Sequence, residues 1–196
     1  MDRFKITTIV SLKAGNTISL ITLNNLNISV PKKILVKDLN ASFNTNEFVA
    51  ILGQNGSGKS LTLHTIAGIR KPSRGNVSVF DDDIDSLNRR DIAERMSLLT
   101  QDSDDVLPST VFDSALIGRH PHIGAFDTES KEDIEMTIKS LKKVNLVPQK
   151  NRDIHSLSGG ERRRLSIAQV INQNSNIILL DEPTNHLDPY YQFKVL

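Results

Sequence analysis

The sequence ILGQNGSGKS, at residues 51–60, places three glycines and one lysine in a stretch of ten residues. Gly53, Gly58, Lys59 and Ser60 fit the pattern G-x-x-x-x-G-K-[ST]. Glycine leaves backbone N–H groups uncovered, so that successive groups can turn toward a phosphate, and a following helix adds the partial positive charge of its N-terminus. A flexible turn is the alternative interpretation of this loop, and the flanking sequence distinguishes the two.

The flanking residues predict a strand before the loop and a helix after it. Residues 48–52, FVAIL, form a continuous apolar run, which is typical of a central parallel strand covered on both faces. Residues 61–69 carry leucine and isoleucine at helical spacing, and Gly68 is a stop signal near the end. Strand, glycine loop and helix are the context of a phosphate-binding P-loop. Lys59 would then reach the outer phosphates of a nucleotide, and the Ser60 hydroxyl would bind Mg²⁺.

A second strand supplies two carboxylates. Residues 177–183, IILLDEP, form an apolar run that ends in Asp181 and Glu182, and Pro183 favours the end of the strand there. An aspartate at this position can hold Mg²⁺ through water, and the glutamate could polarise an attacking water as general base. Taken alone, two solvated acids at a strand end remain the alternative; the P-loop favours the functional interpretation.

The stretch LSGGE at residues 157–161 combines a helix start with two glycines. Ser158 and Glu161 have the spacing of a capping box. The box does not account for Gly159 and Gly160, which cost backbone entropy at a helix start. Two glycines would let a second anion approach the N–H groups of this helix end. We therefore expect a second phosphate site here.

The remaining pattern predicts an α/β core that is interrupted by a helical lobe. Residues 26–30 and 75–80 alternate as half-buried strands do, and residues 96–100 predict another strand. Helical patterns cover residues 111–118, 129–144 and 161–173. The first fifteen residues have no clear period, so that residues 1–15 are interpreted as a tail.

Composition excludes several classes of protein. The chain has 196 residues, 38% of them hydrophobic and 24% charged, and a formal net charge of +1, so no overall field attracts nucleic acid. It has no cysteine, which excludes disulfides and thiolate metal sites and fits a reducing compartment. No apolar run approaches the length of a membrane span, and the N-terminus is not predicted to be a signal peptide. Work at a membrane would require an anchor on another chain.

The P-loop, LSGGE at residues 157–161, the strand at residues 177–182 and HLD at residues 186–188 together resemble the ATP-binding subunit of ABC transporters, over residues 20–196. The resemblance implies a P-loop NTPase core with a mostly parallel sheet, an N-terminal antiparallel β part and an inserted α-helical subdomain at residues 105–174. The domain would occupy residues 16–196 and be incomplete at its C-terminus. Two such subunits would pair head to tail, with each ATP between one P-loop and the partner's LSGGE.

The resemblance also implies roles for individual residues. Catalysis would rest on Glu182 as the catalytic carboxylate, on Lys59, and on Gln101, which matches the Q-loop glutamine that senses Mg²⁺ and the attacking water. Mg²⁺ would be held by Ser60, Gln101 and Asp181. Nucleotide contacts would come from Gly53, Gln54, Asn55, Gly56, Ser57, Gly58, Lys59, Ser60 and Leu61. The signature that acts on the partner's ATP comprises Leu157, Ser158, Gly159, Gly160 and Glu161, and the D-loop comprises His186, Leu187 and Asp188.

A subgroup is indicated by residues 109–127, STVFDSALIGRHPHIGAFD, which look like the corresponding segment of importers of iron-siderophores, haem and cobalamin. The implied partners are a second ATP-binding subunit, an integral membrane permease and, indirectly, a substrate-binding protein, with ATP and Mg²⁺ as cofactors and no nucleic acid. The implied location is peripheral, on the cytoplasmic face of the membrane. His120 and His122 could instead form a metal pair, but two histidines around a proline without a further nearby ligand are more often surface residues.

Three departures from the family pattern stand out. Counting along the chain places Ile28 where an aromatic residue usually stacks on adenine, and Leu61 where a threonine is common. The family's switch histidine and the strand that precedes it are absent before Leu196, so the edge of the strand at residues 177–180 is expected to be uncovered.

Two function classes follow. The first is an ATPase subunit that drives import through a separate permease. The alternative is a truncated nucleotide-binding module that binds ATP and dimerises with little or no turnover. A soluble ABC protein of translation or DNA repair is disfavoured, because the chain shows neither two cassettes nor a coiled coil between the P-loop and LSGGE.

Overall fold

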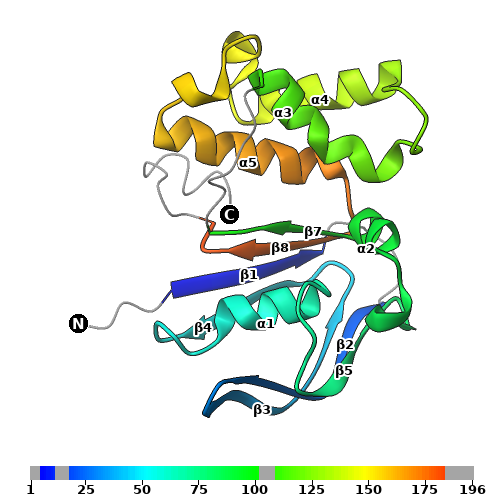
Figure 1. Ribbon diagram of the computed structural model, residues 1–196, viewed down its shortest axis with the longest axis vertical. Coiled ribbons are helices and arrows are strands. Elements are labelled where there is room, and N and C mark those ends of the chain that lie inside the picture. The colour runs from blue at the N-terminus through cyan, green and yellow to red at the C-terminus, as the bar shows by residue number, and fades with distance from the viewer. Residues whose placement is uncertain (1–4, 12–17, 102–108, 184–196) are drawn as a thin grey trace. The chain divides into compact units, whose positions relative to one another are not determined.

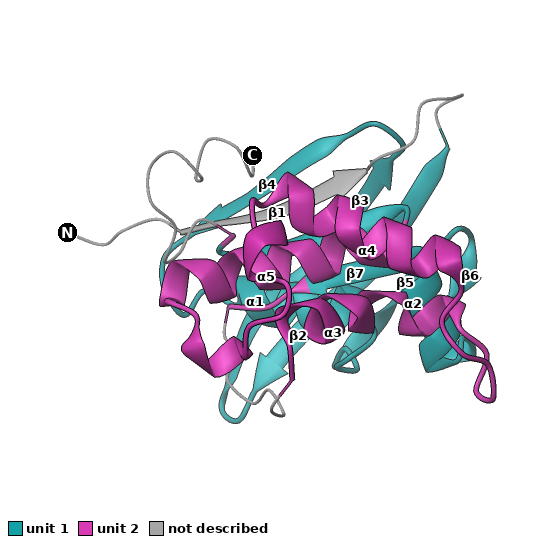
Figure 2. Ribbon diagram, turned by 90° about the horizontal axis from the view of Figure 1, so that it is seen from above, with its two compact units in different colours: residues 1–98, 176–182 teal, residues 99–175, 183–196 magenta. Residues whose placement is uncertain are grey.

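The computed structural model describes residues 5–11, 18–101 and 109–183 (Figure 1). The chain divides into two compact units, one of residues 1–98 with 176–182 and the other of residues 99–175 with 183–196 (Figure 2). The first unit contains the P-loop and both described acidic candidates, and the second contains the LSGGE stretch. Each unit is described by itself.

The first unit contains two β-sheets. One has the strand order β4-β1-β8-β7, and the other has the order β3-β2-β5-β6. The strands are β1 (Lys5–Ser11), β2 (Ser19–Val30), β3 (Lys33–Asn44), β4 (Phe48–Gly53), β5 (Arg74–Val79), β6 (Asp82–Asp83), β7 (Met96–Leu99) and β8 (Ile177–Asp181). The helical segments are α1 (Lys59–Ile66), a short 3-10 turn (Ile84–Ser86) and α2 (Arg89–Arg95).

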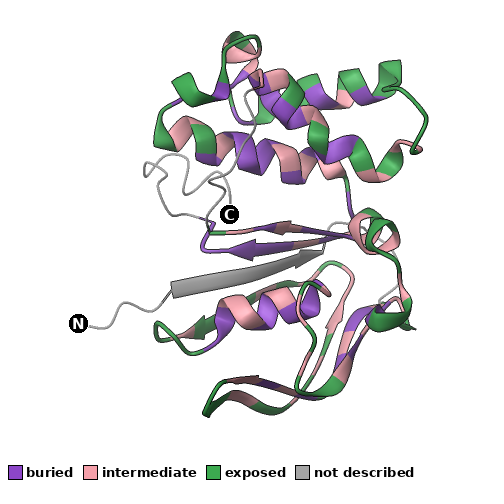
Figure 3. Cartoon of the chain, viewed as in Figure 1, coloured by how far each residue is buried: buried purple, intermediate pink, exposed green. Residues whose placement is uncertain are grey.

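Helix α1 shares one hydrophobic core with both sheets of this unit. Leu63 and Ile66 of α1 are fully buried together with Leu23 of β2 and with Ile177 and Leu179 of β8 (Figure 3). The helix also contacts β4 and β8 directly. The core therefore fixes α1, and with it the loop that precedes α1, against the ends of these two strands.

The N-terminal antiparallel β part is present, since β2 pairs antiparallel with β3 and with β5. The P-loop sheet differs from expectation. β1 runs antiparallel to both β4 and β8 and lies between them, while β7 and β8 point the same way (Figure 1). A strand of opposite direction therefore interrupts the mostly parallel sheet. The tail expected at residues 1–15 is also corrected, because Lys5–Ser11 is a strand.

Two expectations about strand environment are wrong. β4 is an edge strand among the described residues, and Phe48 and Leu52 are 54% and 64% exposed, so it is not covered on both faces. Conversely, β8 is paired on both sides, by β1 and β7, and its edge is not uncovered. An apolar run predicts a strand but not its neighbours, because pairing is decided by segments far away in the sequence.

The second unit is helical among its described residues. Its helices are α3 (Val111–Leu116), which continues into a 3-10 turn (Ile117–His122), α4 (Lys131–Lys143) and α5 (Gly159–Gln173), and short 3-10 turns cover Val147–Gln149 and Ile154–Ser156. The three α-helices pack against one another. Thr110, Ser130 and Ser158 each begin a helix with a capping box, in which a serine or threonine and an acidic residue three positions later bond reciprocally to backbone N–H groups.

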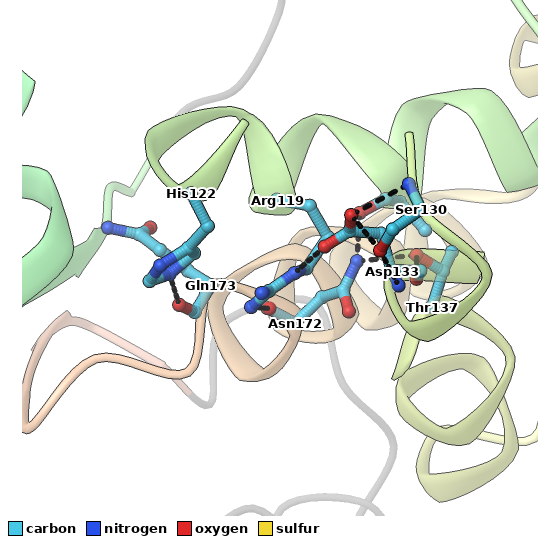
Figure 4. Close-up of polar contacts among 8 residues, drawn as sticks. Arg119, His122, Ser130, Asp133, Thr137, Asn172 and Gln173 are labelled. Atoms are coloured by element: carbon cyan, nitrogen blue, oxygen red, sulfur yellow. Dashed lines mark hydrogen bonds and ion pairs between the residues drawn. The ribbon is translucent and has the colours of Figure 1, made fainter. Parts of the chain in front are cut away.

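A buried polar network ties these helices together (Figure 4). Arg119 Nε donates to Asp133 Oδ1 at 2.8 Å, and Arg119 Nη1 donates to the backbone carbonyl of Asn172 at 3.0 Å. Asn172 Nδ2 donates to Thr137 Oγ1 at 2.8 Å. Hydrogen bonds from Ser130 and then from Arg119 lower the pKa of Asp133 to about 2. The start of α4 and the end of α5 are thus held through one charged pair.

Candidate functional site

The P-loop joins the end of β4 to the start of α1, as the sequence predicts. Gly56 and Gly58 have φ values of 72° and 97°, in the left-handed region that favours glycine. Gly58 is the N-cap of α1, and no side chain forms a cap hydrogen bond at this helix start. Backbone N–H groups at the first turn of a helix lack intrahelical acceptors, so an anion can accept from them.

Close packing inside the loop also favours glycine at its first position. A Cβ added to Gly53 would lie 2.7 Å from Ser57 Oγ, and a Cβ on Gly58 would lie 3.1 Å from Leu35 Cβ. The backbone N–H of Ser57 donates to the carbonyl of Gln54 at 3.2 Å, which closes the turn. The loop is therefore a tightly turned backbone segment.

Lys59 lies inside this loop. Its side-chain Nζ donates to the carbonyls of Gly53 at 2.8 Å and Gln54 at 2.9 Å, and the residue is only 9% exposed. An ammonium group has three donors, so these two bonds fix its position and leave the capacity to bind a phosphate oxygen. A buried cation beside uncapped helix N–H groups favours a polyanionic ligand.

Asp181 is the last residue of β8, and Glu182 follows it within the same unit. They are 2% and 7% exposed, respectively, and Glu182 has a φ of 48°. A left-handed backbone is uncommon for residues other than glycine, and such strain concentrates at functional sites. β4 and β8 are both antiparallel to β1, so their carboxyl ends lie at the same edge of the sheet. The structure thus brings the P-loop and the two acids to one edge.

The residues at this edge fit a magnesium ion bound together with phosphate. No group of three potential metal-ligating acids or histidines occurs among the residues described. Mg²⁺ at phosphate sites needs only one or two protein ligands besides phosphate oxygens and water. Asp181, at the end of β8, and the partly buried Ser60, in the first turn of α1, supply a carboxylate and a hydroxyl of the required kinds.

The other predicted site residues lie in different parts of the chain. Gln101 and the 157–161 signature belong to the second unit, and the D-loop residues His186, Leu187 and Asp188 lie outside the described residues. Gln54, Asn55 and Ser57 are exposed on the loop, and Leu61 is half-buried in α1.

The signature stretch has the expected helix start. Ser158 Oγ accepts from the backbone N–H of Glu161 at 3.3 Å, and the carboxylate of Glu161 accepts from the N–H of Ser158 at 2.9 Å. This backbone bond is the main cause of a lowered pKa of Glu161. Gly159 is exposed, and a Cβ added to it would meet no atom within 4 Å. Leu157 is buried in its own unit, whereas Ser158 is exposed.

The adenine position assigned by counting needs correction. Ile28 is 1% exposed and belongs to the hydrophobic core, so it presents no surface to a base. Sequence counting missed Leu35, whose side chain lies against Gly58, and its neighbour Ile34, which is 59% exposed. The hairpin of β2 and β3 brings Leu35 to the P-loop. No local sequence signal predicts this tertiary contact.

The two histidines on either side of Pro121 belong to the second unit. His122 Nε2 is 2.7 Å from the carbonyl of Gln173, and both His120 and His122 are exposed. Among the described helices, none has the length and hydrophobicity to cross a membrane.

Fold and site define the class: an α/β protein with a P-loop for nucleotide phosphates. A family model described as "ABC transporter" matches residues 36–185. The chain belongs to this family, as an ABC transporter ATP-binding protein. The resemblance inferred from the motifs is thereby confirmed.

The named relatives of this chain include ATP-binding proteins of importers. The chain is 34% identical to the petrobactin import ATP-binding protein FpuD of Bacillus anthracis, over 87% of this chain and 63% of that protein. It is 33% identical to the iron(3+)-hydroxamate import ATP-binding protein FhuC of Bacillus subtilis, over 87% and 64%. A solved structure of a metal-chelate-type ABC transporter in an inward-facing conformation is 30% identical, with a TM-score of 0.73 over 90% of this chain and 65% of that one. The chain thus spans less than two thirds of the length of each of these proteins.

Proposed function

We propose that this chain is the ATP-binding and ATP-hydrolysing subunit of an ABC importer. It would power uptake of a metal chelate, such as an iron-siderophore, haem or cobalamin, through a separate membrane permease. The observation that carries the proposal is the buried Lys59 ammonium in an uncapped glycine loop, at the same sheet edge as Asp181 and Glu182. The relatives that import petrobactin and iron-hydroxamate support the class of substrate.

Each residue at the edge has a separate chemical task. Lys59 and the first N–H groups of α1 would bind the phosphates and hold the reacting phosphate in position. Ser60 and Asp181 would hold Mg²⁺, which neutralises charge on the phosphate oxygens when bound. Glu182 would orient the attacking water and accept its proton, a role worth ~10²–10⁴-fold in rate. Leu35 and Ile34 of β3 would offer the adenine an apolar surface beside the loop.

The proposal includes partners. A second copy or a related subunit would contribute its exposed Ser158 and Gly159 to the ATP held on this P-loop, in a head-to-tail dimer. The permease would anchor the dimer on the cytoplasmic face of the membrane, and a substrate-binding protein would deliver the chelate to the permease. Gln101, in the second unit, would sense Mg²⁺ and the attacking water.

Lys59→Ala tests the nucleotide site. We expect the substitution to abolish detectable binding of a fluorescent ATP analogue, because the ammonium supplies the cation at the centre of the loop. Lys71→Ala is the matched control, since the Lys71 side chain is 81% exposed in the same unit. Equal affinities of the Lys59→Ala variant and the parent chain would contradict the assignment.

Turnover and transport need separate measurements. Steady-state phosphate release by the parent chain, absent in Glu182→Gln, would support an ATPase; tight ATP binding without phosphate release would favour the nucleotide-binding module instead.

Cells whose copy of the gene carries Lys59→Ala should lose uptake of one labelled chelate among ferric siderophore, haem and cobalamin. Undiminished uptake of all three would refute the importer proposal.

A further inference from the structure

The hairpin of β2 and β3 contacts the start of α1 and the segment that follows this helix (Figure 1). At the start of α1, a Cβ on Gly58 would lie 3.4 Å from Leu35 Cδ1, so the Leu35 side chain packs directly against the last glycine of the P-loop. Beyond the end of α1, the Arg70 guanidinium donates to the backbone carbonyl of Ser29. The hairpin is therefore held against the helix that begins at the phosphate loop.

The register of the hairpin determines which side chains are turned toward α1. Ile28 of β2 is 1% exposed and belongs to the core that includes residues of α1. Val30 lies two residues farther along β2, on the same face, and is paired opposite Lys33. A register shift between the pairs of Ile28 and Ser29 leaves Leu35 as the extra residue of a β-bulge. Val30, Lys33 and Leu35 are therefore on the face of the hairpin that is turned toward α1.

The tip of the hairpin is positively charged. Lys32 and Lys33 are both exposed, and residues 28–37, ISVPKKILVK, include no acidic and no aromatic residue. Among the residues that the structure describes, neither lysine forms an ion pair. Lys33 is two residues from Leu35, which is about 7 Å along a strand, and a lysine side chain spans a similar length. Its ammonium group can therefore reach a ligand that is bound at the start of α1.

We propose that Lys33 binds the phosphates of the nucleotide on the P-loop, as a second cation besides Lys59. A nucleoside triphosphate carries more negative charge than one lysine and one Mg²⁺ neutralise, and a further cation that faces the loop attracts the remaining charge. Leu35 offers the base an aliphatic surface without a hydrogen bond, and such a surface discriminates weakly between bases. This inference rests on the proposed nucleotide site and adds to it a segment outside the P-loop pattern.

Two adjacent lysines provide a matched pair for the test. Lys33→Gln and Lys32→Gln each remove one exposed positive charge from the hairpin. Lys32 lies in the turn, with a φ of 71°, and not on the strand face that carries Lys33. Lys33→Arg keeps the charge of the parent chain. Because both positions are exposed, none of these variants should have a lower unfolding temperature than the parent chain, and this is measured for each of them.

The dissociation constants of Mg-ATP and Mg-GTP are measured at several NaCl concentrations. Lys33→Gln should weaken binding of both nucleotides about tenfold at low salt, as expected for a lost hydrogen bond between charged groups, and Lys33→Arg should restore it. The affinity of Lys33→Gln should also fall less steeply with salt than that of the parent chain, because one screened charge pair has been removed. Lys32→Gln should match the parent chain in affinity and in salt dependence.

Two results would overturn the inference. One is a nucleotide affinity of Lys33→Gln equal to that of Lys32→Gln while Lys59→Ala still abolishes binding. The other is a loss for only one of the two nucleotides, since that pattern places the Lys33 side chain at the base and not at the phosphates. Failure of the parent chain itself to bind either nucleotide would instead refute the proposed nucleotide site.

Discussion

At the scale of single residues, buried charges organise both units. Lys59 is held by two backbone carbonyls in the P-loop, and Arg119 is held by Asp133 and by the carbonyl of Asn172 in the helical unit. Removing one partner of a buried pair leaves the other charge without compensation, which costs more than the pair contributes to stability. These residues are therefore sensitive positions for substitution.

The Asp133 carboxylate makes stability depend on pH. Its pKa in the folded state, about 2, is lower than the ordinary value of 3.8. A group with a lowered pKa contributes stability that is fully present above its unfolded pKa and is lost as pH falls through the folded one. We expect thermal unfolding temperatures to fall between pH 4 and pH 2, and this part of the fall to be absent in Asp133→Asn.

At pH 7, Asp133→Asn should destabilise the chain by on the order of 3 kcal/mol, because Arg119 stays buried without its carboxylate. Glu132→Gln, at the exposed neighbouring position in α4, should have little effect at either pH. A denaturant titration of the three chains measures this. Equal stability of Asp133→Asn and the parent chain would show that the ion pair does not hold the helical unit together.

At the scale of elements, β1 determines whether β8 has an unpaired edge. It lies between β4 and β8 and pairs with both, so that the backbone groups of β8 are engaged on two sides. An unpaired apolar edge would favour aggregation. Because β1 pairs with β8 along this edge, the unpaired and aggregation-prone β8 edge expected from the sequence is not found.

Thr8→Pro tests the contribution of β1. Proline removes a backbone donor in the middle of a strand that is paired on both sides; it should cost on the order of 1–3 kcal/mol for the lost hydrogen bond and expose the edges of β4 and β8. We expect a lower unfolding temperature and oligomers in light scattering, whereas Thr8→Val should remain monodisperse. A stable, monodisperse Thr8→Pro chain would mean that β1 is dispensable for the sheet.

At the scale of the whole molecule, the proposed function requires two half-sites, and their residues belong to two different units. The P-loop with Asp181 and Glu182 belongs to the first unit, and the helix start at Ser158 and Gly159 belongs to the second. Under the proposed function each half-site is completed by a partner subunit. Nucleotide and dimerisation should then be linked, since a ligand that binds only the dimer stabilises it.

Glu182→Gln should bind ATP, fail to hydrolyse it and elute as a dimer in size-exclusion chromatography with Mg-ATP. Adding Gly159→Ala should return it to the monomer position, because a Cβ at this helix start would stand where the partner's phosphate approaches, with a loss of about tenfold or more in dimer affinity. Among the described residues the added Cβ has no neighbour within 4 Å, so the unfolding temperature should not fall. A dimer that persists in the double variant would place the second phosphate contact elsewhere.

Local sequence signals determined much of the chain. The P-loop pattern, the strand that ends at Asp181 and the capping box of Ser158 with Glu161 all appear where they were predicted, because each depends on residues within a few positions of one another. A cap needs only a side chain and an N–H group three residues away, and a glycine loop needs only positive φ values.

The pairing partners of the strands, in contrast, depend on contacts between distant segments. Residues 5–11 have no decisive local pattern, yet they pair with strands about 45 and 170 residues away, which places Thr7 opposite Asp181. Ile28 counts as an adenine contact in sequence but is buried, since the sheets and α1 close over it. Arg119 and Asp133 pair across 14 residues, and Arg119 reaches Asn172 across 53. Such contacts arise from the packing of distant segments, and no sequence period encodes them.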